Sequence, residues 1–368
     1  MGRLPLDGLT VISIEQAVAA PFTSSRLADA GARVIKIERP EGDFARGYDD
    51  VANGLSSYFV WLNRGKQSLV LDLTRADAKA ELRALLADAD VLIQNLKPGA
   101  LGRLGFDRAT LRALNRKLIT CSITGYGETG PLADRKAYDL LIQAESGLAS
   151  VTGGPEQPAR VGTSIVDIAT GATAYAAILE ALIGRSLNGE GVDISVSMFD
   201  VMADWLTVPL MHEEAGNSPK RLGLAHPSIA PYGVFRTADG KSLLISIQSD
   251  REWSKFAAQF LEDASLATNI QFATNVARVA NRTETDALVA AAFARMDEEG
   301  AIAALTRADV AFASVNDMSA LSVHPHLRRI EVQTQNGPVA FPAPAPIFAD
   351  QQRAYGSVPA LGEHEVVS

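Results

Sequence analysis

The alternation of short β-branched segments with helix-like segments in the first 200 residues restricts the fold more than any other feature of this chain. Strand-like segments span residues 9–14, 32–38, 68–73, 90–96 and 117–124, and helical spacing is found between them, most clearly over 75–89. Strands that alternate with helices form a parallel sheet that is covered on both faces. We therefore predict an α/β, Rossmann-like domain whose ligand binds at the carboxyl ends of the strands.

The second half of the chain has a different pattern, which predicts a second domain. Residues 213–233 are rich in Gly and Pro and show no periodicity, as is typical of a linker or a functional loop. A hairpin pattern follows at 233–248, then helical segments, then a second hairpin at 329–348. We predict a large domain over 1–212, a linker over 213–233 and a small α+β domain over 234–329.

The charged, histidine and cysteine residues argue against several classes of function. The net charge of −9 comes from scattered residues, whereas a nucleic-acid surface needs clustered Lys and Arg. No uncharged run reaches the roughly 18–20 residues that span a bilayer, and the first residues lack a signal-peptide pattern. The five histidines show no metal-ligand spacing, and Cys121, in a buried strand, is interpreted as a packing residue. We expect a cytoplasmic protein without a metal, a membrane partner or a nucleic-acid partner.

One carboxylate stands in an apolar segment, and its position allows two roles. Asp167 lies between Ile165, Val166 and Ile168 at the start of a long apolar helix. An Asp at this place can cap the helix by accepting a backbone N–H, or it can serve as a nucleophile. Both roles require the same position along the chain, so the segment alone does not decide between them.

The segment "GYGETG" at 125–130 matches the glycine pattern of a dinucleotide-binding loop and follows a strand. That motif requires its last glycine to open a helix whose N–H groups hold a pyrophosphate. Here Pro131 and a segment without helical periodicity follow, and no acidic residue ends a second strand about 20 residues on. We predict that this segment is not a dinucleotide site.

Six segments of this chain, two of which include the residues discussed above, occur in the same order as the sequence motifs of a known family. They are "GARVIKIERPEGD", "WLNRGKQSLVLDL", "DVLIQNLKPGALGRLGFD", "LITCSITGYGETGP", "KAYDLLIQAESGLASVTG" and "SIVDIATG". Together they resemble the class III coenzyme A transferases, which include formyl-CoA transferase, carnitine CoA transferases and α-methylacyl-CoA racemase. The resemblance runs from about residue 5 to "LGEH" at 361–364. It implies an interlaced homodimer in which residues 330–368 complete the large domain.

The resemblance also implies a reaction and a nucleophile. In this family CoA moves between carboxylic acids through an acyl-aspartyl anhydride and an aspartyl-CoA thioester, and "SIVDIATG" places Asp167 at the nucleophile. Burial among its apolar neighbours would raise the pKa of Asp167, whereas free N–H groups at a helix N-terminus would favour the anion. We therefore expect a reactive acid that is still ionised. Coenzyme A is then a substrate, and no tightly bound cofactor is expected.

Positions that match CoA contacts of the family follow from the same motifs. They include the loop beside the nucleophile, the adenine side, the phosphate-binding cations and the thioester region: Val18, Ala19, Arg39, Leu71, Thr74, Arg75, Asn95, Leu96, Arg103, Lys136 and Tyr138. Arg75 is expected to compensate for Thr74, where many relatives carry Lys. Each cation has an alternative interpretation as a solvated surface charge. Tyr48 and Tyr58 are candidates to face the acyl group, with a core aromatic as the alternative.

Two departures from the family pattern bear on the substrate. Racemases carry a proton-transferring His where this chain has Ala137, so α-proton exchange lacks a base. The glycine run of formyl-CoA transferase is also missing, which argues against formate–oxalate exchange. The segments "EQAVAAPF" and "HPSIAPYGVF" are similar to the mesaconyl-CoA C1–C4 transferase branch, which predicts a C4–C5 dicarboxylate such as mesaconate, succinate or itaconate. An acyl-CoA racemase or isomerase, or a non-catalytic CoA-binding partner, are the alternatives.

Overall fold

The computed structural model describes residues 3–349, 351 and 353–365, which fall into two compact units. The first unit comprises residues 1–148, 160–208 and 328–368, and the second comprises 149–159 and 209–327. The second unit thus includes a short segment, 149–159, that lies well before the predicted linker. Each unit is described by itself below.

A six-stranded sheet forms the centre of the first unit, with the order β3-β2-β1-β4-β5-β6 and every pairing parallel. Its strands are β1 (Thr10–Ile14), β2 (Arg33–Glu38), β3 (Lys66–Val70), β4 (Val91–Gln94), β5 (Ile119–Thr124) and β6 (Asp193–Ser197). This order confirms the predicted α/β fold. It places a topological switch point between β1 and β4, which is where such sheets bind ligands.

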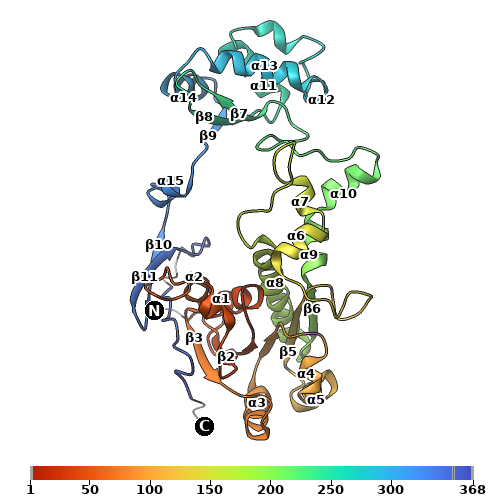
Figure 1. Cartoon of the computed structure of the whole chain (residues 1–368), viewed down its shortest axis with the longest axis vertical. Helices are drawn as coiled ribbons and strands as arrows, with labels where there is room; N and C mark the ends of the chain where they lie inside the picture. Colours follow the sequence, from red (N-terminus) through yellow and green to blue (C-terminus); the bar gives the residue numbers. More distant parts are fainter. Residues whose placement is uncertain (1–2, 350, 352, 366–368) are drawn as a thin grey trace. The chain divides into compact units, whose positions relative to one another are not determined.

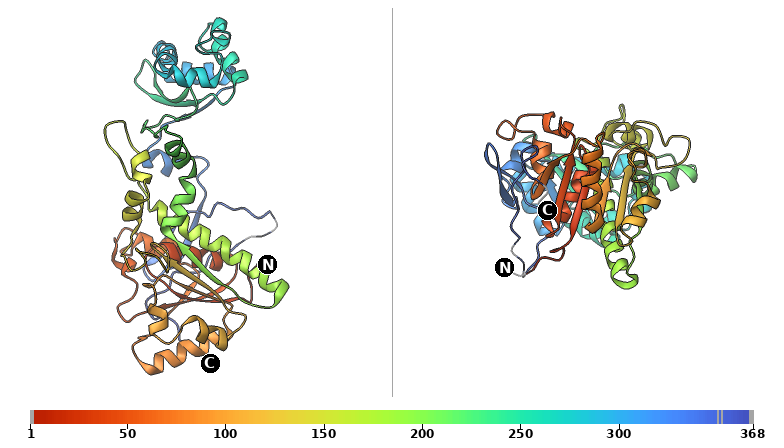
Figure 2. Two further views of the ribbon diagram at one scale, coloured as in Figure 1. Left: turned by 90° about the vertical axis from the view of Figure 1, so that its right-hand side faces the viewer. Right: turned by 90° about the horizontal axis from the view of Figure 1, so that it is seen from below.

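Helices cover both faces of the sheet, as Figures 1 and 2 show. Alternate residues along one strand serve opposite faces, so that Val11 packs toward α1 and α8 whereas Ile12 packs toward α3 and α5. The helices of this unit are α1 (Ala19–Asp29), η1 (Phe44–Gly47), α2 (Ser57–Asn63), α3 (Ala76–Asp88), α4 (Ala100–Arg103), α5 (Arg108–Leu114), α6 (Asp139–Glu145), α8 (Ile165–Asn188) and α9 (Met198–Trp205). Helices α7 (Leu148–Val151) and α10 (Thr207–Glu214) lie at the unit boundaries.

The C-terminal segment belongs to the first unit. A hairpin of β10 (Arg329–Thr334) and β11 (Gly337–Pro342) precedes it, and Val332 packs against Phe59 and Val358. Farther on, the Gly65 N–H donates to the Ser357 carbonyl at 2.8 Å and the Gly362 N–H donates to Ser68 Oγ at 3.0 Å. Residues 357–362 therefore lie along β3 and the residue before it.

A three-stranded antiparallel sheet and several α-helices form the second unit. The strands are β7 (Tyr232–Arg236), β8 (Ser242–Ser246) and β9 (Ala311–Ser314), and the first two form the hairpin predicted over 233–248. The helices are α11 (Asp250–Gln259), η2 (Ala264–Ala267), α12 (Asn275–Ala280), α13 (Arg282–Phe293) and α14 (Glu298–Arg307), with the short α15 (Met318–Ser322) beyond β9. Trp253, Phe256 and Phe293 pack on β8 in its core.

Helix α8 is the one helix in the described residues that is long and apolar enough to cross a membrane, by length and composition alone. Core helices have the same properties, and α8 buries Val166, Ala169 and Ile178 in the core against α1 and the sheet. Cys121 is buried in that core, where burial raises the pKa of its thiol to about 12. Its predicted role in packing is confirmed.

Candidate active site

Two adjoining cavities lie at the carboxyl ends of the strands in the first unit. The smaller has a volume of about 240 Å³ and the larger about 760 Å³, and both are lined by Gln16 and Leu96. Gln16 follows β1 and Asn95 follows β4, so these residues stand at the switch point. The Gln16 N–H donates to Asn95 Oδ1 at 3.0 Å, and Asn95 Nδ2 donates to the Gln16 carbonyl at 2.9 Å. This reciprocal pair links the ends of β1 and β4 beside the cavities.

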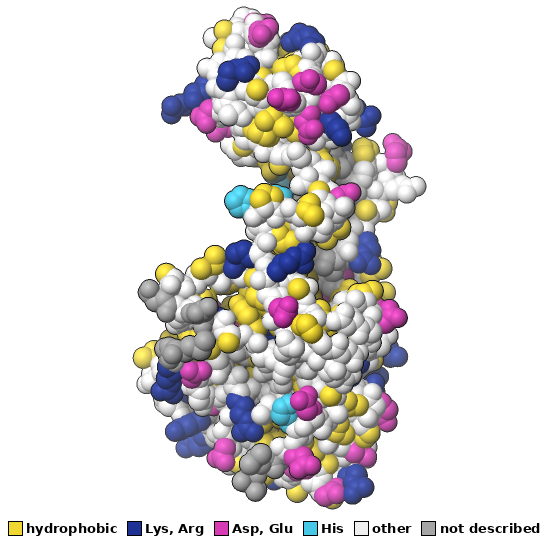
Figure 3. All heavy atoms as spheres, turned by 90° about the vertical axis from the view of Figure 1, so that its left-hand side faces the viewer, with side chains coloured by type: hydrophobic (Ala, Val, Ile, Leu, Met, Phe, Trp, Pro, Cys, Tyr) yellow, Lys and Arg dark blue, Asp and Glu magenta, His cyan; other side chains and the backbone are white. Residues whose placement is uncertain are grey.

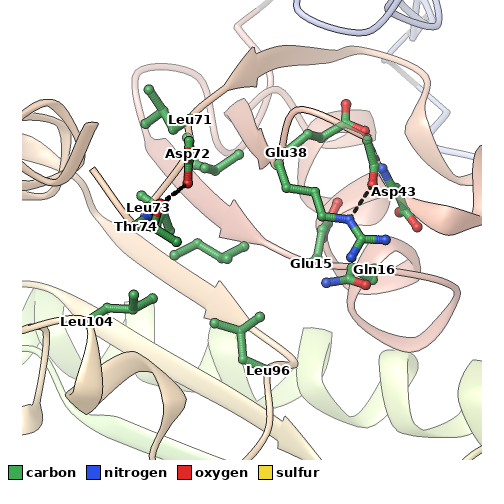
Figure 4. Close-up of a pocket in the computed structure, with 14 residues that line it drawn as sticks. Glu15, Gln16, Glu38, Asp43, Leu71, Asp72, Leu73, Thr74, Leu96 and Leu104 are labelled. Carbon is green, nitrogen blue, oxygen red and sulfur yellow. Dashed lines mark hydrogen bonds between the residues drawn. The ribbon is translucent and has the colours of Figure 1, made fainter. Parts of the chain in front are cut away.

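The smaller cavity has apolar walls and a polar edge, as Figure 4 shows. Its walls include Leu71, Leu73, Leu96 and Leu104, and carboxylates of Glu15, Glu38, Asp43 and Asp72 lie around them. Asp72 Oδ1 accepts hydrogen bonds from the N–H and the hydroxyl of Thr74, at 3.0 and 2.6 Å. Four of the predicted CoA-contact residues line this cavity: Arg39, Leu71, Thr74 and Leu96.

The larger cavity brings together most of the other predicted residues. These are Val18, Ala19, Tyr48, Tyr58, Asn95, Leu96, Arg103, Lys136, Tyr138 and Asp167. Tyr48 is 46% exposed, which argues against its alternative as a core aromatic. Arg75 lines neither cavity. It is paired with Asp77 at 2.7 Å and is largely exposed, so its contact with CoA stays a prediction.

The position of Asp167 decides against the cap interpretation. It is the third residue of α8, whose N-cap is Ser164. The two free backbone N–H groups of the first turn, those of Val166 and Asp167, donate instead to Oδ1 of Asp139 at 2.8 and 3.2 Å. Among the described residues, none donates a hydrogen bond to the carboxylate of Asp167. Asp139 caps this helix, and the side chain of Asp167 faces the cavity.

The expected electrostatic balance at Asp167 is therefore wrong. We expected the helix N-terminus to keep the acid charged, but Asp139 occupies those N–H donors. Burial, together with the negative charge of Asp139, raises the pKa of Asp167 to about 7. Near neutral pH, the side chain thus exchanges between an acid and a carboxylate.

A buried charge network supports the loop beside Asp167. Glu15 pairs with Lys66 at 2.7 Å, and Lys36 pairs with Asp43 at 2.8 Å, with all four side chains buried. Burial alone would raise the pKa of Glu15, but the ammonium groups of Lys66 and Lys36 outweigh it and lower the value to about 2. Asp43 Oδ1 in turn accepts from the N–H of Ala17 at 3.1 Å. The network thus holds the loop that carries Val18 and Ala19.

Ala17 and Gly171 show how tightly this loop is fixed. Ala17 has a φ of +63°, a left-handed conformation that is uncommon for a residue with a Cβ. Gly171 lies one turn of α8 beyond Asp167, and a Cβ at this position would lie 2.6 Å from the carbonyl oxygen of Ala19. The absence of a side chain at Gly171 therefore lets the start of α1 lie directly against the turn that carries Asp167.

Several cations of the larger cavity have no acidic partner within the described part of the chain. Arg135 is paired with Glu145 at 2.7 Å, but no ion pair is found for Lys97, Arg103, Lys136 or Arg160. Arg160 donates through Nε to the carbonyl of Val161 at 3.1 Å. Such cations suit anionic groups of a ligand. No three His, Cys, Asp or Glu side chains gather as a metal site would need, in the residues that the structure describes.

Sequence reasoning missed four residues of this site: Gln16, Asp139, Gln143 and Arg160. Gln16 follows β1 and Asn95 follows β4. The rule that ligands bind at the carboxyl ends of the two strands that flank the switch point could have indicated both residues. The role of Asp139 depends on a contact between α6 and α8, and no local pattern indicates it. By contrast, "GYGETG" lies in bends and the next helix begins only at Asp139, so the helix that a dinucleotide loop requires does not follow this segment.

The sequence model described as CoA-transferase family III matches residues 6–365. The chain belongs to this family. This CoA-transferase is 36% identical to the succinate–glutarate CoA-transferase of Agrobacterium fabrum, with 98% of this chain and 94% of that protein covered. It is 41% identical to the acetyl-CoA:oxalate CoA-transferase of Acetobacter aceti, with 78% and 74% covered. A crystal structure of a CaiB/BaiF family protein from Brucella suis matches with a TM-score of 0.82 at 36% identity, covering 99% of this chain and 98% of that chain.

Proposed function

We propose that this CoA-transferase moves coenzyme A between C4–C5 dicarboxylic acids, with Asp167 as the covalent nucleophile. The observation that carries the proposal is the environment of Asp167. Its carboxyl group faces the larger cavity, accepts no hydrogen bond from the described residues, and has a pKa raised to about 7. A carboxylate without a fixed donor keeps its lone pairs available for attack on a thioester.

The proposed reaction uses Asp167 twice. Its carboxylate attacks the carbonyl carbon of the acyl-CoA and the C–S bond breaks. The CoA thiolate departs, and an acyl-aspartyl anhydride is formed. The thiolate then attacks Cγ of Asp167, which releases the donor carboxylate and forms an aspartyl-CoA thioester. The acceptor carboxylate repeats both steps in reverse, which yields the new acyl-CoA and the free side chain. No net proton is taken up or released between donor and acceptor carboxylates.

The two cavities suit the two ends of the CoA molecule. The smaller cavity, with leucine walls and acceptors at its edge, is proposed to hold the adenine ring, whose amino group can donate to a carboxylate. Arg39 lies at the same cavity, and Lys97, Arg103 and Lys136 line the larger one, where they can bind phosphate oxygens. The thiol end would then reach toward Asp167, beside Val18, Ala19 and Tyr138.

Two observations support a dicarboxylate substrate. The curated relative from A. fabrum is named for succinate and glutarate, and the one from A. aceti for oxalate. Arg160 lines the same cavity as Asp167 and has no acidic partner among the described residues, so it can bind the carboxylate that does not react. Mesaconate and itaconate remain candidates through the resemblance of the loop segments to the mesaconyl-CoA branch.

The alternatives of racemase and non-catalytic binder are less well supported. Ala137 lines the larger cavity at the position where a racemase has its histidine, and its methyl group cannot act as an acid or a base. A non-catalytic binder would not need an acid beside Val18 and Ala19. Uptake of deuterium at the α-carbon in heavy water would identify a racemase. CoA binding without exchange of labelled CoA into acyl-CoA would identify a binder.

The protein is further proposed to act as a cytoplasmic homodimer, without a tightly bound cofactor and without a nucleic-acid or membrane partner. Large apolar side chains of its first unit are exposed, among them Ile183 and Leu187 at the end of α8 and Trp205 on α9. Ile183 and Leu187 are four residues apart and share one face of α8, and an apolar patch on a helix face is the kind of surface that a partner covers. Lys and Arg side chains are interspersed with Asp and Glu on the face drawn in Figure 3.

The experiment that tests this function is a transfer assay with a panel of acceptors. Succinyl-CoA is incubated with glutarate, mesaconate, itaconate or oxalate, and the acyl-CoA products are separated and identified by mass spectrometry. We expect transfer to at least one C4–C5 diacid and a loss of transfer in Asp167→Asn. Full activity in Asp167→Asn would exclude the proposed nucleophile, and transfer to oxalate alone would exclude the proposed substrate class.

A further inference from the structure

Asp139 links three segments of the candidate active site. It is the first residue of α6, directly after the loop that carries Lys136 and Tyr138. Its Oδ1 accepts from the N–H groups of Val166 and Asp167 in the first turn of α8, at 2.8 and 3.2 Å. Its Oδ2 accepts from Nε2 of Gln143 at 2.6 Å.

Gln143 extends this connection to a third segment. Its side chain is fully buried, and its Oε1 accepts from the N–H of Val161 at 2.9 Å. Val161 is the neighbour of Arg160, the cation proposed to bind the second carboxylate of the substrate. Both polar atoms of the Gln143 amide are thus used, one for Asp139 and one for the segment before α8.

We propose that Asp139 is a positioning residue which, with Gln143, fixes the turn carrying Asp167 relative to the Lys136–Tyr138 loop and to Arg160; this inference rests on the proposed function of Asp167 as the nucleophile. Ser164 is the N-cap of α8 but makes no side-chain cap hydrogen bond, so Asp139 supplies the cap from another helix. A carboxylate is the group that the start of a helix binds best. These hydrogen bonds therefore fix the position of Asp167 relative to the loop that carries Lys136 and Tyr138.

The negative charge of Asp139 has a second effect on the same turn. It lies next to Asp167 and adds to burial in raising the pKa of that acid. Besides Asp139, the larger cavity contains the phenols of Tyr48, Tyr58 and Tyr138. Its cations are Lys97, Arg103, Arg135, Lys136 and Arg160, of which Arg135 is paired with Glu145. Asp139 is the acidic group that acts on Asp167, so its removal should shift the ionisation of Asp167.

The substitution Asp139→Asn breaks the connection at a defined atom. The Asn oxygen can still accept from the two N–H groups of α8, but its NH₂ group then faces the NH₂ group of Gln143. Turning the Gln143 amide would only move the conflict to the N–H of Val161. The double substitution Asp139→Asn with Gln143→Glu removes it, because a carboxylate at 143 accepts from both neighbours and restores the negative charge one hydrogen bond farther from Asp167.

The test compares wild type, Asp139→Asn and the double variant. For Asp139→Asn we expect kcat/KM to fall by roughly ten- to a hundredfold, as for a lost hydrogen bond to a charged group and a displaced nucleophile. The acidic limb of its pH profile should move to lower pH, since Asp167 loses a negative neighbour. The double variant should recover most of the activity, with an acidic limb between the other two.

Three results would overturn the inference. The first is wild-type activity and an unmoved acidic limb in Asp139→Asn, and the second is an activity loss that only follows the fraction of folded protein. The third is a folded double variant no more active than Asp139→Asn. If Asp139→Asn does not fold, the double variant alone decides. The inference then requires that the double variant have activity within about fivefold of the wild type and an acidic limb of its pH profile displaced from that of the wild type. Wild-type protein that forms no covalent adduct at Asp167 would instead overturn the proposed function.

Discussion

The substitution Gly171→Ala tests whether the close approach of α1 and α8 positions the nucleophile. An added Cβ would lie 2.6 Å from the carbonyl oxygen of Ala19 and 2.9 Å from Cβ of Phe22, both on α1. Thr23 Oγ1 also donates to the Gly171 carbonyl at 3.0 Å, so the two helices are joined at this point. Because the obstructing atoms include backbone, a rotamer change cannot relieve the overlap.

The geometry sets the size of the effect. Ordinary van der Waals contact begins at 3.4 Å, so the start of α1 must move away from α8 by roughly 0.8 Å. Overpacking of this kind costs about 1–3 kcal/mol of folding free energy. A displacement near 1 Å in a reacting geometry costs on the order of a hundredfold in rate. We therefore expect a kcat that is lower by roughly ten- to a hundredfold, with a smaller change in KM.

The assay measures kcat and KM for CoA transfer together with the midpoint of thermal unfolding. Gly184→Ala is the matched control, because Gly184 lies on the same helix and a Cβ there meets no atom within 4 Å. Replacing a helical Gly by Ala should stabilise the helix by up to about 1 kcal/mol. Gly171→Ala with wild-type kcat and an unchanged unfolding midpoint would refute the reasoning.

Three further changes have defined outcomes. Asp167→Asn should raise the free energy of unfolding at pH 8 by roughly 2–4 kcal/mol but not at pH 4. The reason is that the pKa of Asp167 is raised in the folded protein, so that the wild type loses stability as the pH rises toward 7. An equal effect on thermal unfolding at both pH values would contradict this. Arg103→Ala should raise the KM for acyl-CoA roughly tenfold through a lost phosphate contact, whereas Arg116→Ala, in an exposed pair with Glu190, should not; equal KM values would remove Arg103 from the site. Lys66→Met should lower the stability by about 3–5 kcal/mol, because Glu15 loses a buried partner; an unchanged unfolding midpoint would show that Lys36 alone neutralises Glu15.

Most elements of the first unit could be predicted because their signals are local. β-Branched runs separated by amphipathic segments give strand and helix without knowledge of the tertiary structure. The prediction is displaced at β3, which spans Lys66–Val70 rather than 68–73. Lys66 is a charged residue that begins this buried strand, and Glu15, 51 residues earlier, neutralises its ammonium group. A contact over that separation leaves no mark in the local pattern.

The residues of the candidate site divide in the same way. Asp167, Arg39 and Asn95 lie at ends of helices or strands, where local sequence and family motifs indicate them. The hydrogen bonds from α8 to Asp139 do not follow from either segment alone, and they reverse the expected electrostatics of Asp167. The sequence could place the acid at the start of a helix, but it could not show that another acid already occupies the helix N-terminus.

Trapping with hydroxylamine tests the central claim most directly. Wild-type protein is incubated with succinyl-CoA and hydroxylamine without an acceptor acid, then digested and analysed by tandem mass spectrometry. Attack of hydroxylamine on Cγ of Asp167 in the thioester or the anhydride releases CoA or succinate and leaves an aspartyl hydroxamate, which should form only when the acyl-CoA is present. We predict modification of the peptide that contains residue 167. An unmodified peptide from a preparation that transfers CoA once an acceptor acid is added, or a hydroxamate on another residue, would contradict the account.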